Sequence, residues 1–166
     1  MRKFAVITAA LALLAGTIAA MSIASASAAP KHAAADSVKV LHLISHDTSV
    51  NGLDLGKKGP SPGDQIMEST ADFQNGKLVD HGFLNCVRVR VNVTARMENV
   101  LCHGAMIFNN GQVQIQGETT FHTPFTVAVT GGTGAYQNAG GQLTLLRTLP
   151  NGNDVETLRL VFFETG

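Results

Sequence analysis

One glycine-rich segment, residues 130–141, constrains the fold of this chain more than any other part of its sequence. It contains five glycines and lies between two runs, 125–129 and 142–146, in which apolar and polar residues alternate. Clustered glycines between two such runs are typical of a turn that connects β-strands. A dinucleotide-binding loop would need a third glycine where Gln137 stands, and then a helix whose N-terminus faces the phosphates. No helical pattern follows, so the segment is interpreted as a hairpin connection.

The same period-two alternation recurs along the rest of the chain, and it is the pattern of half-buried strands. It predicts an all-β, antiparallel domain with short turns and no helix. A sheet of this size closes or folds over, because open strand edges invite aggregation. The predicted strands are residues 38–45, 65–73, 83–93, 100–108, 112–121, 125–130, 142–149 and 155–164.

Tight turns are predicted at residues 109–111, where Asn110 and Gly111 favour positive φ, and at 150–153. The longest loop spans residues 51–64. Long loops at the end of a barrel often carry function. A passive, solvated loop fits the same sequence equally well.

Residues 83–93 show the clearest alternation, because four valines are interleaved with Cys86, Arg88, Arg90 and Asn92. Charged side chains are rarely fully buried. The pattern alone therefore favours the valines in the core and both arginines on a solvated face.

The N-terminus has the three-part layout of a secretory signal peptide. Arg2 and Lys3 precede an apolar stretch at residues 4–20, and a small-residue cleavage site follows at 26–28. We expect residues 1–28 to be removed, 29–37 to form a flexible leader, and 38–166 to form one secreted domain. A membrane anchor is the alternative, since the stretch approaches the length that spans a bilayer.

Composition excludes several classes of partner. The chain has 12 basic and 12 acidic side chains, so loss of Arg2 and Lys3 leaves 10 against 12, a net charge of −2. Nucleic-acid binding needs a basic face, and a chain with no tryptophan and one tyrosine lacks stacking platforms. No second apolar span, metal-ligand spacing or nucleophile elbow is present. We expect no metal, no cofactor, and no stable membrane association after cleavage.

The two cysteines, Cys86 and Cys102, lie on consecutive predicted strands that can pair as a hairpin around residues 94–98. An even cysteine count in a secreted chain favours a disulfide. A slip of one or two residues in the strand register would prevent the bridge.

The glycine-rich segment also carries a resemblance. Residues 127–134, followed by 139–141, resemble the barrel signature of dirigent proteins and allene oxide cyclases. Weaker matches follow in the same order along most of the mature chain, at His46-Asp47, Gly63-Asp64, residues 85–87 and residues 111–117. The resemblance implies an eight-stranded antiparallel barrel of allene oxide cyclase/dirigent type. With the signal peptide and paired cysteines, it is most similar to secreted bacterial members, and these families commonly form dimers or trimers.

The resemblance also sets which residues face inward. Asp47 resembles the pocket aspartate of dirigent proteins, which is thought to assist ring closure of a quinone-methide-type intermediate. Alternate positions would then place Leu41, Leu43 and Ser45 inside. The match of Cys86 to a cavity cysteine of allene oxide cyclases places three neighbours inside (Leu84, Arg88 and Arg90), and through the bridge four residues of the next strand (Val100, Cys102, Met106 and Phe108). Glu68 and Thr70 align with inward positions of the second strand.

These inward positions supply the candidate site. Asp47 and Glu68 are the candidate catalytic residues; Ser45, Thr70, Arg88, Met106 and Phe108 are the candidate cavity residues. Such carboxyl groups, beside a guanidinium and an apolar wall, could act as general acid or base. Two alternatives remain open: Asp47 caps a turn at Thr48-Ser49, and Cys86 is a cavity thiol rather than half of a disulfide.

The expected function is a secreted barrel that binds a small hydrophobic molecule and steers or catalyses cyclisation or isomerisation of a reactive intermediate. The alternatives are a non-catalytic extracellular binder and a structural barrel with a packed interior. If the protein is an enzyme, it is an isomerase, a cyclase or a dirigent-type stereochemical guide. Allene oxide cyclases have an inward glutamate where Ser45 aligns and a phenylalanine where Glu68 aligns, so their own activity is not expected.

Overall fold

The computed structural model describes residues 35–94, 97–120 and 124–163. The expected signal peptide, and the expected leader as far as residue 34, lie outside the described residues. The first strand already begins at Ala35, so the last three residues of the expected leader belong to the barrel sheet. Within the described ranges, no helix is long and apolar enough to cross a membrane.

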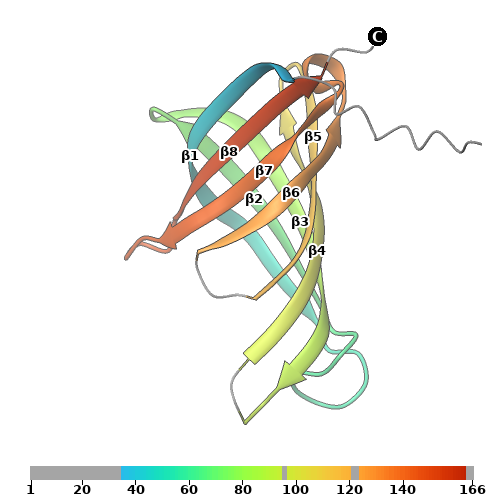
Figure 1. Ribbon diagram of the computed structural model, residues 1–166. Coiled ribbons are helices and arrows are strands. Elements are labelled where there is room, and N and C mark those ends of the chain that lie inside the picture. The colour runs from blue at the N-terminus through green and yellow to red at the C-terminus, as the bar shows by residue number, and fades with distance from the viewer. Residues whose placement is uncertain (1–34, 95–96, 121–123, 164–166) are drawn as a thin grey trace, which may run out of the picture. The chain divides into compact units, whose positions relative to one another are not determined.

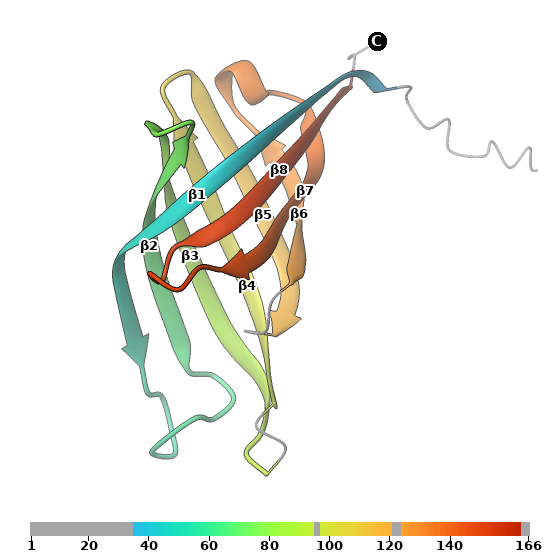
Figure 2. The same ribbon diagram turned by 90° about the vertical axis from the view of Figure 1, so that its left-hand side faces the viewer.

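Eight antiparallel strands form a closed barrel in which each strand pairs with its neighbours in sequence and β1 pairs with β8 (Figures 1 and 2). This confirms the predicted all-β, eight-stranded antiparallel barrel. Closure leaves no free strand edge, which is how such sheets avoid edge-to-edge association. The strands are β1 (Ala35–Leu53), β2 (Gln65–Gln74), β3 (Lys77–Asn92), β4 (Met97–Phe108), β5 (Gly111–Thr120), β6 (Phe125–Gly132), β7 (Ala139–Thr148) and β8 (Asp154–Phe163).

Two hairpins show how local sequence sets the strand ends. Asn75 and Gly76 join β2 to β3 with φ angles of 51° and 73°, the left-handed conformation that a tight hairpin turn requires. The sequence analysis did not identify this turn, so β3 begins at Lys77, six residues before the expected run. At the hairpin between β4 and β5 the turn lies at Asn109 and Asn110 as expected, and Phe108 pairs with Gly111 across it. Gly111 has the expected positive φ, at 149°, whereas Asn110 does not.

The glycine-rich segment connects β6 to β7, as expected from its flanking runs. Its centre is a single 3-10 turn, η1 (Gly134–Tyr136). Tyr136 is buried, and its ring lies against Phe108 with 4.8 Å between the ring centroids. Gly134 has a φ of 60°, and a Cβ there would collide with the carbonyl oxygen of Asn110. Glycine is therefore required for the turn that brings Tyr136 to this end of the barrel.

Alternate positions fill the interior on most strands, and around Cys86 on β3 the alternation is the reverse of what periodicity alone favoured. Cys86 is 2% exposed, whereas Val89 is 38% exposed. The phase implied by the match to the allene oxide cyclase cysteine is thus correct for Cys86, because its bridge to β4 fixes it inside. A register irregularity between Arg88 and Arg90 then turns Arg90 outward, so its expected inward position is wrong.

Candidate functional site

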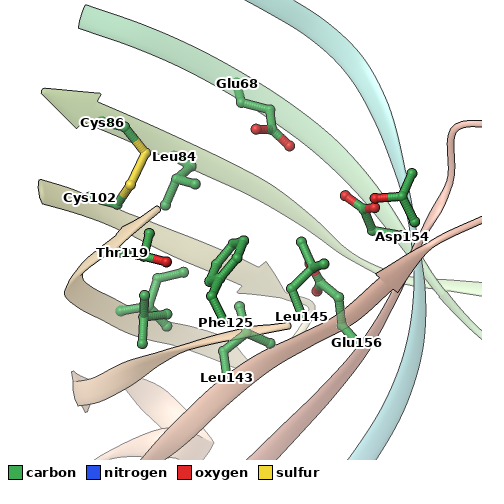
Figure 3. A pocket seen from close by; sticks show the side chains of 13 residues that line it. Glu68, Leu84, Cys86, Cys102, Thr119, Phe125, Leu143, Leu145, Asp154 and Glu156 are labelled. Atoms are coloured by element: carbon green, nitrogen blue, oxygen red, sulfur yellow. A yellow bond between two sulfur atoms is a disulfide. The ribbon is translucent and has the colours of Figure 1, made fainter. Parts of the chain in front are cut away.

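The barrel encloses a cavity of about 160 Å³ in which carboxyl groups face a hydrocarbon wall (Figure 3). Glu68 comes from β2, and Asp154 and Glu156 come from β8. Apolar side chains from β3, β5, β6 and β7 form the opposite wall. These are Leu84, Ile115, Phe125, Val127, Leu143 and Leu145. The cavity resembles ligand sites in general, which are mostly apolar with a few polar groups that orient the ligand.

A narrower extension of about 50 Å³ shares part of this lining, including Glu68 and Glu156. The candidates Thr70 and Met106 line this extension together with Asp72. The structure therefore brings Glu68, Thr70 and Met106, all singled out from the sequence, into one connected region of the interior.

A row of polar side chains crosses four neighbouring strands on the inner face. Cross-strand pairing places Asp154 opposite Ser45, Ser45 opposite Asp72, and Asp72 opposite Asp80. The Ser45 hydroxyl donates a 2.5 Å hydrogen bond to Oδ1 of Asp72. Ser45, Asp72 and Asp80 are all buried. The row thus connects a cavity-lining carboxyl group to two carboxyl groups that are closed off from solvent.

Two members of this row have unsatisfied oxygens. Neither carboxyl oxygen of Asp80 has a hydrogen-bond partner within the described part of the chain, and the same holds for Oδ1 of Asp154. Buried polar groups are nearly always hydrogen-bonded, and an ionised carboxyl group can only accept. Asp80 and Asp154 therefore lack donors that would stabilise their ionised forms.

The pKa values of the interior carboxyl groups reflect this environment. The pKa of Glu68 is raised to about 8. Burial is the largest cause, and the interaction with the neighbouring Asp47 is the next largest. Burial likewise raises the pKa of Glu156 to about 8, and the negative charges of Asp72 and Asp154 add to it. For Asp80 burial raises the pKa to about 9, with a further contribution from Asp72. At neutral pH the protonated form of all three groups is favoured, because an apolar environment and like charges disfavour the ionised form.

Asp47 lies within β1 and not at a turn. The strand continues to Leu53, and a register irregularity between Asp47 and Ser49 interrupts its pairing with β2. The alternative that Asp47 caps a turn at Thr48-Ser49 is therefore wrong: both residues are in extended backbone. Asp47 is exposed, and its side chain interacts with that of Glu68. It is thus the most solvated of the interacting carboxyl groups.

The remaining candidates lie elsewhere. Phe108 packs against Tyr136 and lines a depression at the end of the barrel that carries the glycine-rich turn. Arg88 lines a second depression beside the loop between β1 and β2, where its guanidinium lies 2.7 Å from Glu98 and 3.7 Å from Asp64. Neither residue is among those that line the central cavity. Arg88 thus supplies no positive charge to the cavity carboxyl groups.

Sequence reasoning missed four interior carboxyl groups: Asp72, Asp80, Asp154 and Glu156. The signal was available in the period-two pattern, because Asp72 follows Glu68 and Thr70 at alternate positions. Asp154 and Glu156 similarly precede Leu158 and Leu160, which are buried. Acidic residues at inward positions are unusual in a core. Their presence there was therefore a sequence signal for the site.

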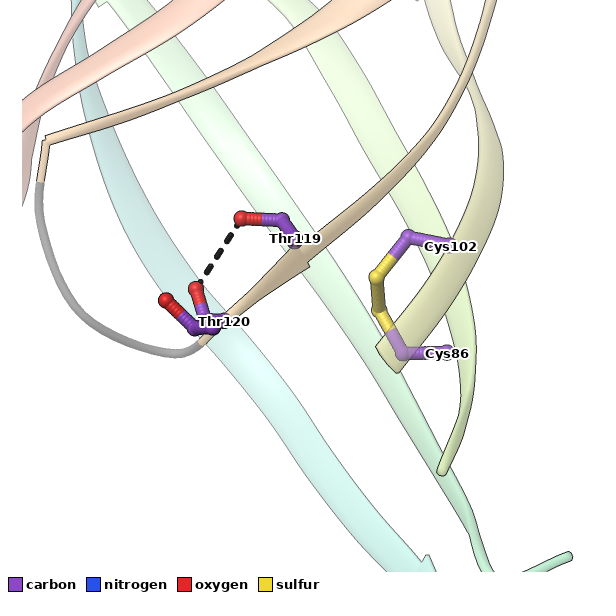
Figure 4. Close-up of a disulfide and its surroundings, with 4 residues drawn as sticks. All are labelled: Cys86, Cys102, Thr119 and Thr120. Carbon is purple, nitrogen blue, oxygen red and sulfur yellow. Dashed lines mark hydrogen bonds between the residues drawn. A yellow bond between two sulfur atoms is a disulfide. The ribbon is translucent and has the colours of Figure 1, made fainter. Parts of the chain in front are cut away.

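Cys86 and Cys102 form the predicted disulfide, which confirms the pairing of β3 with β4 (Figure 4). The two residues are directly opposite in the register, and both line the cavity. Nearby, the Thr119 hydroxyl donates a 3.0 Å hydrogen bond to the carbonyl oxygen of Thr120. With both cysteines bridged, no thiol is free, so the alternative of a cavity thiol is excluded in this structure.

With this geometry defined, the barrel can be compared with known proteins. No protein-family model matches the chain, and no curated protein matches it. Several solved structures are similar to it. A pyocyanin demethylase is 28% identical with a TM-score of 0.64, over 73% of this chain and 99% of that chain. The Diels-Alderase AbmU from Streptomyces koyangensis is 14% identical with a TM-score of 0.63, over 78% and 70%. The pterocarpan synthase dirigent protein PsPTS1 is 18% identical with a TM-score of 0.57, over 80% and 99%.

The barrel has a dirigent-like fold. The neighbours include a dirigent protein and cyclase barrels, so the resemblance noted in the sequence is supported at the level of fold. Fold alone does not define chemistry, and the site must be interpreted from its own residues. Among the described residues, no group of three or more histidine, cysteine, aspartate or glutamate side chains is arranged to hold a metal ion.

Proposed function

We propose that this protein binds a small, largely apolar molecule in the barrel cavity and steers its cyclisation or isomerisation by proton transfer. The observation that carries the proposal is the placement of Glu68 and Glu156 in one cavity against a hydrocarbon wall. The wall would hold and orient the molecule. The two carboxyl groups would give or take the proton.

The acidity of these groups suits that role. A general acid works best when its pKa lies near the working pH, and burial raises the pKa of both Glu68 and Glu156 to about 8. Holding a flexible molecule in one reactive conformation supplies a further part of the rate enhancement. Asp47, which is exposed and interacts with Glu68, would exchange protons between Glu68 and solvent.

The structural neighbours support the same class of reaction. Two carry names of ring-forming catalysts, a Diels-Alderase and a pterocarpan synthase. The pyocyanin demethylase carries the name of a different reaction on a different molecule. What the three share is a barrel of this kind that acts on a small molecule. We also propose that the mature protein is secreted, because a structural disulfide is typical of oxidising compartments.

Binding is tested by blocking the cavity. Leu143 lines it and Leu146 is 45% exposed, so Leu143→Trp and Leu146→Trp form a matched pair. We expect naphthalene, added to the ¹⁵N-labelled barrel, to shift the amide signals of β6, β7 and β8 in the wild type and in Leu146→Trp. Leu143→Trp should remain folded, judged by its dispersed spectrum, and show no shifts. Equal shifts in both variants would place the binding site elsewhere.

Catalysis is tested with extracts of the producing organism's culture medium. We expect the wild type to convert a component of the extract, detected by mass spectrometry coupled to chiral chromatography. Glu68→Gln and Glu156→Gln should retain that component without converting it, since an amide keeps the shape but loses the acid. Retention without conversion by the wild type would instead identify a non-catalytic binder.

A further inference from the structure

We infer that the molecule held in this cavity carries a positive charge, and is an aromatic cation of one or two rings. This rests on the proposed function, because it names the chemical class of the ligand for the same cavity.

Acidic groups from three strands interact in and beside the cavity, and no basic group is among them. Asp47 comes from β1, Glu68 and Asp72 from β2, and Asp154 and Glu156 from β8; these five interact electrostatically. None of the described residues that line the cavity or its extension is lysine, arginine or histidine. A set of carboxyl groups with no cationic partner attracts a cation from outside the chain.

Three basic side chains of the described strands are engaged away from the cavity. Arg88 contacts Glu98 and Asp64, and Arg90 contacts Glu118. Lys39 lies over the ring of Tyr136, 5.5 Å from its centroid, and lines the depression at the end of the barrel that carries the glycine-rich turn.

Asp154, which lines the cavity itself, gives a second indication. Its Oδ1 is buried and has no hydrogen-bond partner within the described part of the chain. Natural interiors rarely leave acceptors unsatisfied, and a positive charge in the cavity would compensate for the missing donor.

The rest of the lining determines what kind of cation fits. Calcium and magnesium ions seek six or more oxygen ligands, whereas the rest of the lining is mostly hydrocarbon, with one aromatic ring (Phe125), the disulfide and two threonines (Figure 3). An aromatic cation of one or two rings satisfies both sides, since its apolar surface covers the largely hydrocarbon wall and its charge lies against the carboxyl groups. An aromatic face adds a further attraction for a cation. The volume of about 160 Å³ suits one or two rings, because a cavity of about 150 Å³ binds benzene.

A cation would change the protonation of the site. Burial and the surrounding acidic groups (Asp47, Asp72 and Asp154) raise the pKa values of Glu68 and Glu156 to about 8, which favours their protonated forms at neutral pH. A bound positive charge favours the ionised form. The O–H bond of one carboxyl group then breaks and its proton leaves to solvent. Binding should therefore release protons and become tighter as pH rises toward 8, by up to about tenfold per pH unit for each proton released.

The test compares two probes of the same shape, N-methylquinolinium, which is a permanent cation, and 1-methylnaphthalene, which is neutral. Affinities are measured by amide shift titration at pH 6, 7 and 8, and proton release is measured with an indicator in weakly buffered solution. At pH 8 we expect the cation to bind at least tenfold more tightly than the neutral probe. Its affinity should increase as the pH rises, and its binding should release protons. The neutral probe should bind with no pH dependence and release none.

Two variants and a control make the result specific. Glu156→Gln and Glu68→Gln should each weaken cation binding at pH 8 by at least tenfold and leave the neutral probe unchanged. Glu118 is an exposed residue that contacts Arg90, and Glu118→Gln should change the affinity for neither probe. Equal or tighter binding of 1-methylnaphthalene in the wild type would overturn the cationic ligand and leave the proposed function intact. Binding of neither probe would overturn both.

Discussion

Asp72 and Asp80 lie directly opposite each other on β2 and β3, with side chains that are each 2% exposed. Two adjacent carboxyl groups in an apolar interior do not both ionise near neutral pH, because like charges and burial both favour the protonated form. The pair therefore retains a proton, and the Ser45 hydroxyl also donates to Asp72. The barrel thus closes around an acidic interior that is kept largely uncharged.

Asp80→Asn should make the stability of the barrel less sensitive to pH. Folded Asp80 has a pKa of about 9, whereas an unfolded aspartate has one near 3.9. Between these values the folded state holds a proton that the unfolded chain has lost, so the free energy of unfolding falls as pH rises through this window. The amide removes this ionisation and should flatten the decline of Tm between pH 5 and pH 9, measured by thermal denaturation.

The control for this experiment is Glu118→Gln, which removes an exposed carboxyl group. Its melting curve should follow that of the wild type across the same pH range. A wild-type Tm that does not fall toward pH 9 would show that Asp80 ionises freely in the folded protein.

Asp47→Asn should lower the pKa of Glu68. After burial, the interaction with Asp47 is the largest cause that raises this pKa to about 8, and the variant removes the negative charge. Carbon-detected NMR titration of the glutamate carboxyl signals follows Glu68 directly. If the role of Asp47 is electrostatic, the variant should lose activity at a lower pH than the wild type, because Glu68 would lose its proton at a lower pH. An unchanged Glu68 titration would mean that solvent screens Asp47 completely.

Much of the fold could be predicted from local sequence, because each strand carries its own alternation and each turn its own glycine or asparagine. The glycine-rich segment indicated the β6–β7 connection, and Cys86 and Cys102 indicated that β3 pairs with β4. These features depend on residues close together in the chain. The turn at Asn75 and Gly76 carried the same kind of signal and was missed, which delayed the predicted start of β3.

The composition of the site was less predictable, because it depends on which face of each strand turns inward. On β3, valines alternating with arginines favour one phase by polarity, and only the bridge at Cys86 fixes the opposite one. The irregularity after Arg88 then changes the phase again within the same strand. Asp154 and Glu156 could not be grouped with Glu68 in advance, since β8 and β2 approach each other only when the barrel closes.

Asp64 should control the order of the loop between β1 and β2. The backbone N–H groups of Leu55 and Ser61 donate to its carboxylate at 2.9 Å and 2.7 Å, and these bonds hold the pKa of Asp64 below its ordinary value. Asp64→Ala should speed hydrogen exchange at both amides, whereas Asp64→Asn, which keeps one acceptor, should speed it less. Amide exchange followed by NMR at neutral pH separates the two variants.

The pH dependence of this loop follows from the sign of the shift. A carboxyl group with a lowered folded pKa stabilises the folded state above its unfolded pKa, and that contribution is lost as pH falls through the folded value. Protection of Leu55 and Ser61 in the wild type should therefore persist through the ordinary aspartate range and disappear only at lower pH. Loss of protection already near pH 5 would contradict the assigned contacts.

Gly104→Ala should destabilise the barrel, because β4 passes too close to β3 at this point for a side chain. A Cβ at Gly104 would collide with the carbonyl oxygen of Phe83 and come within 3.0 Å of the Leu84 side chain, which lines the cavity. The backbone cannot move aside without breaking strand pairing, so we expect a loss of about 1–3 kcal/mol in the free energy of unfolding.

Gly131→Ala is the matched control, because Gly131 lies in β6 with no atom within 4 Å of the added Cβ. There, alanine should change stability little or raise it slightly, since it reduces the entropy of the unfolded chain. Urea denaturation measures both, and equal stabilities of the two variants would show that β3 and β4 separate at Gly104 without cost.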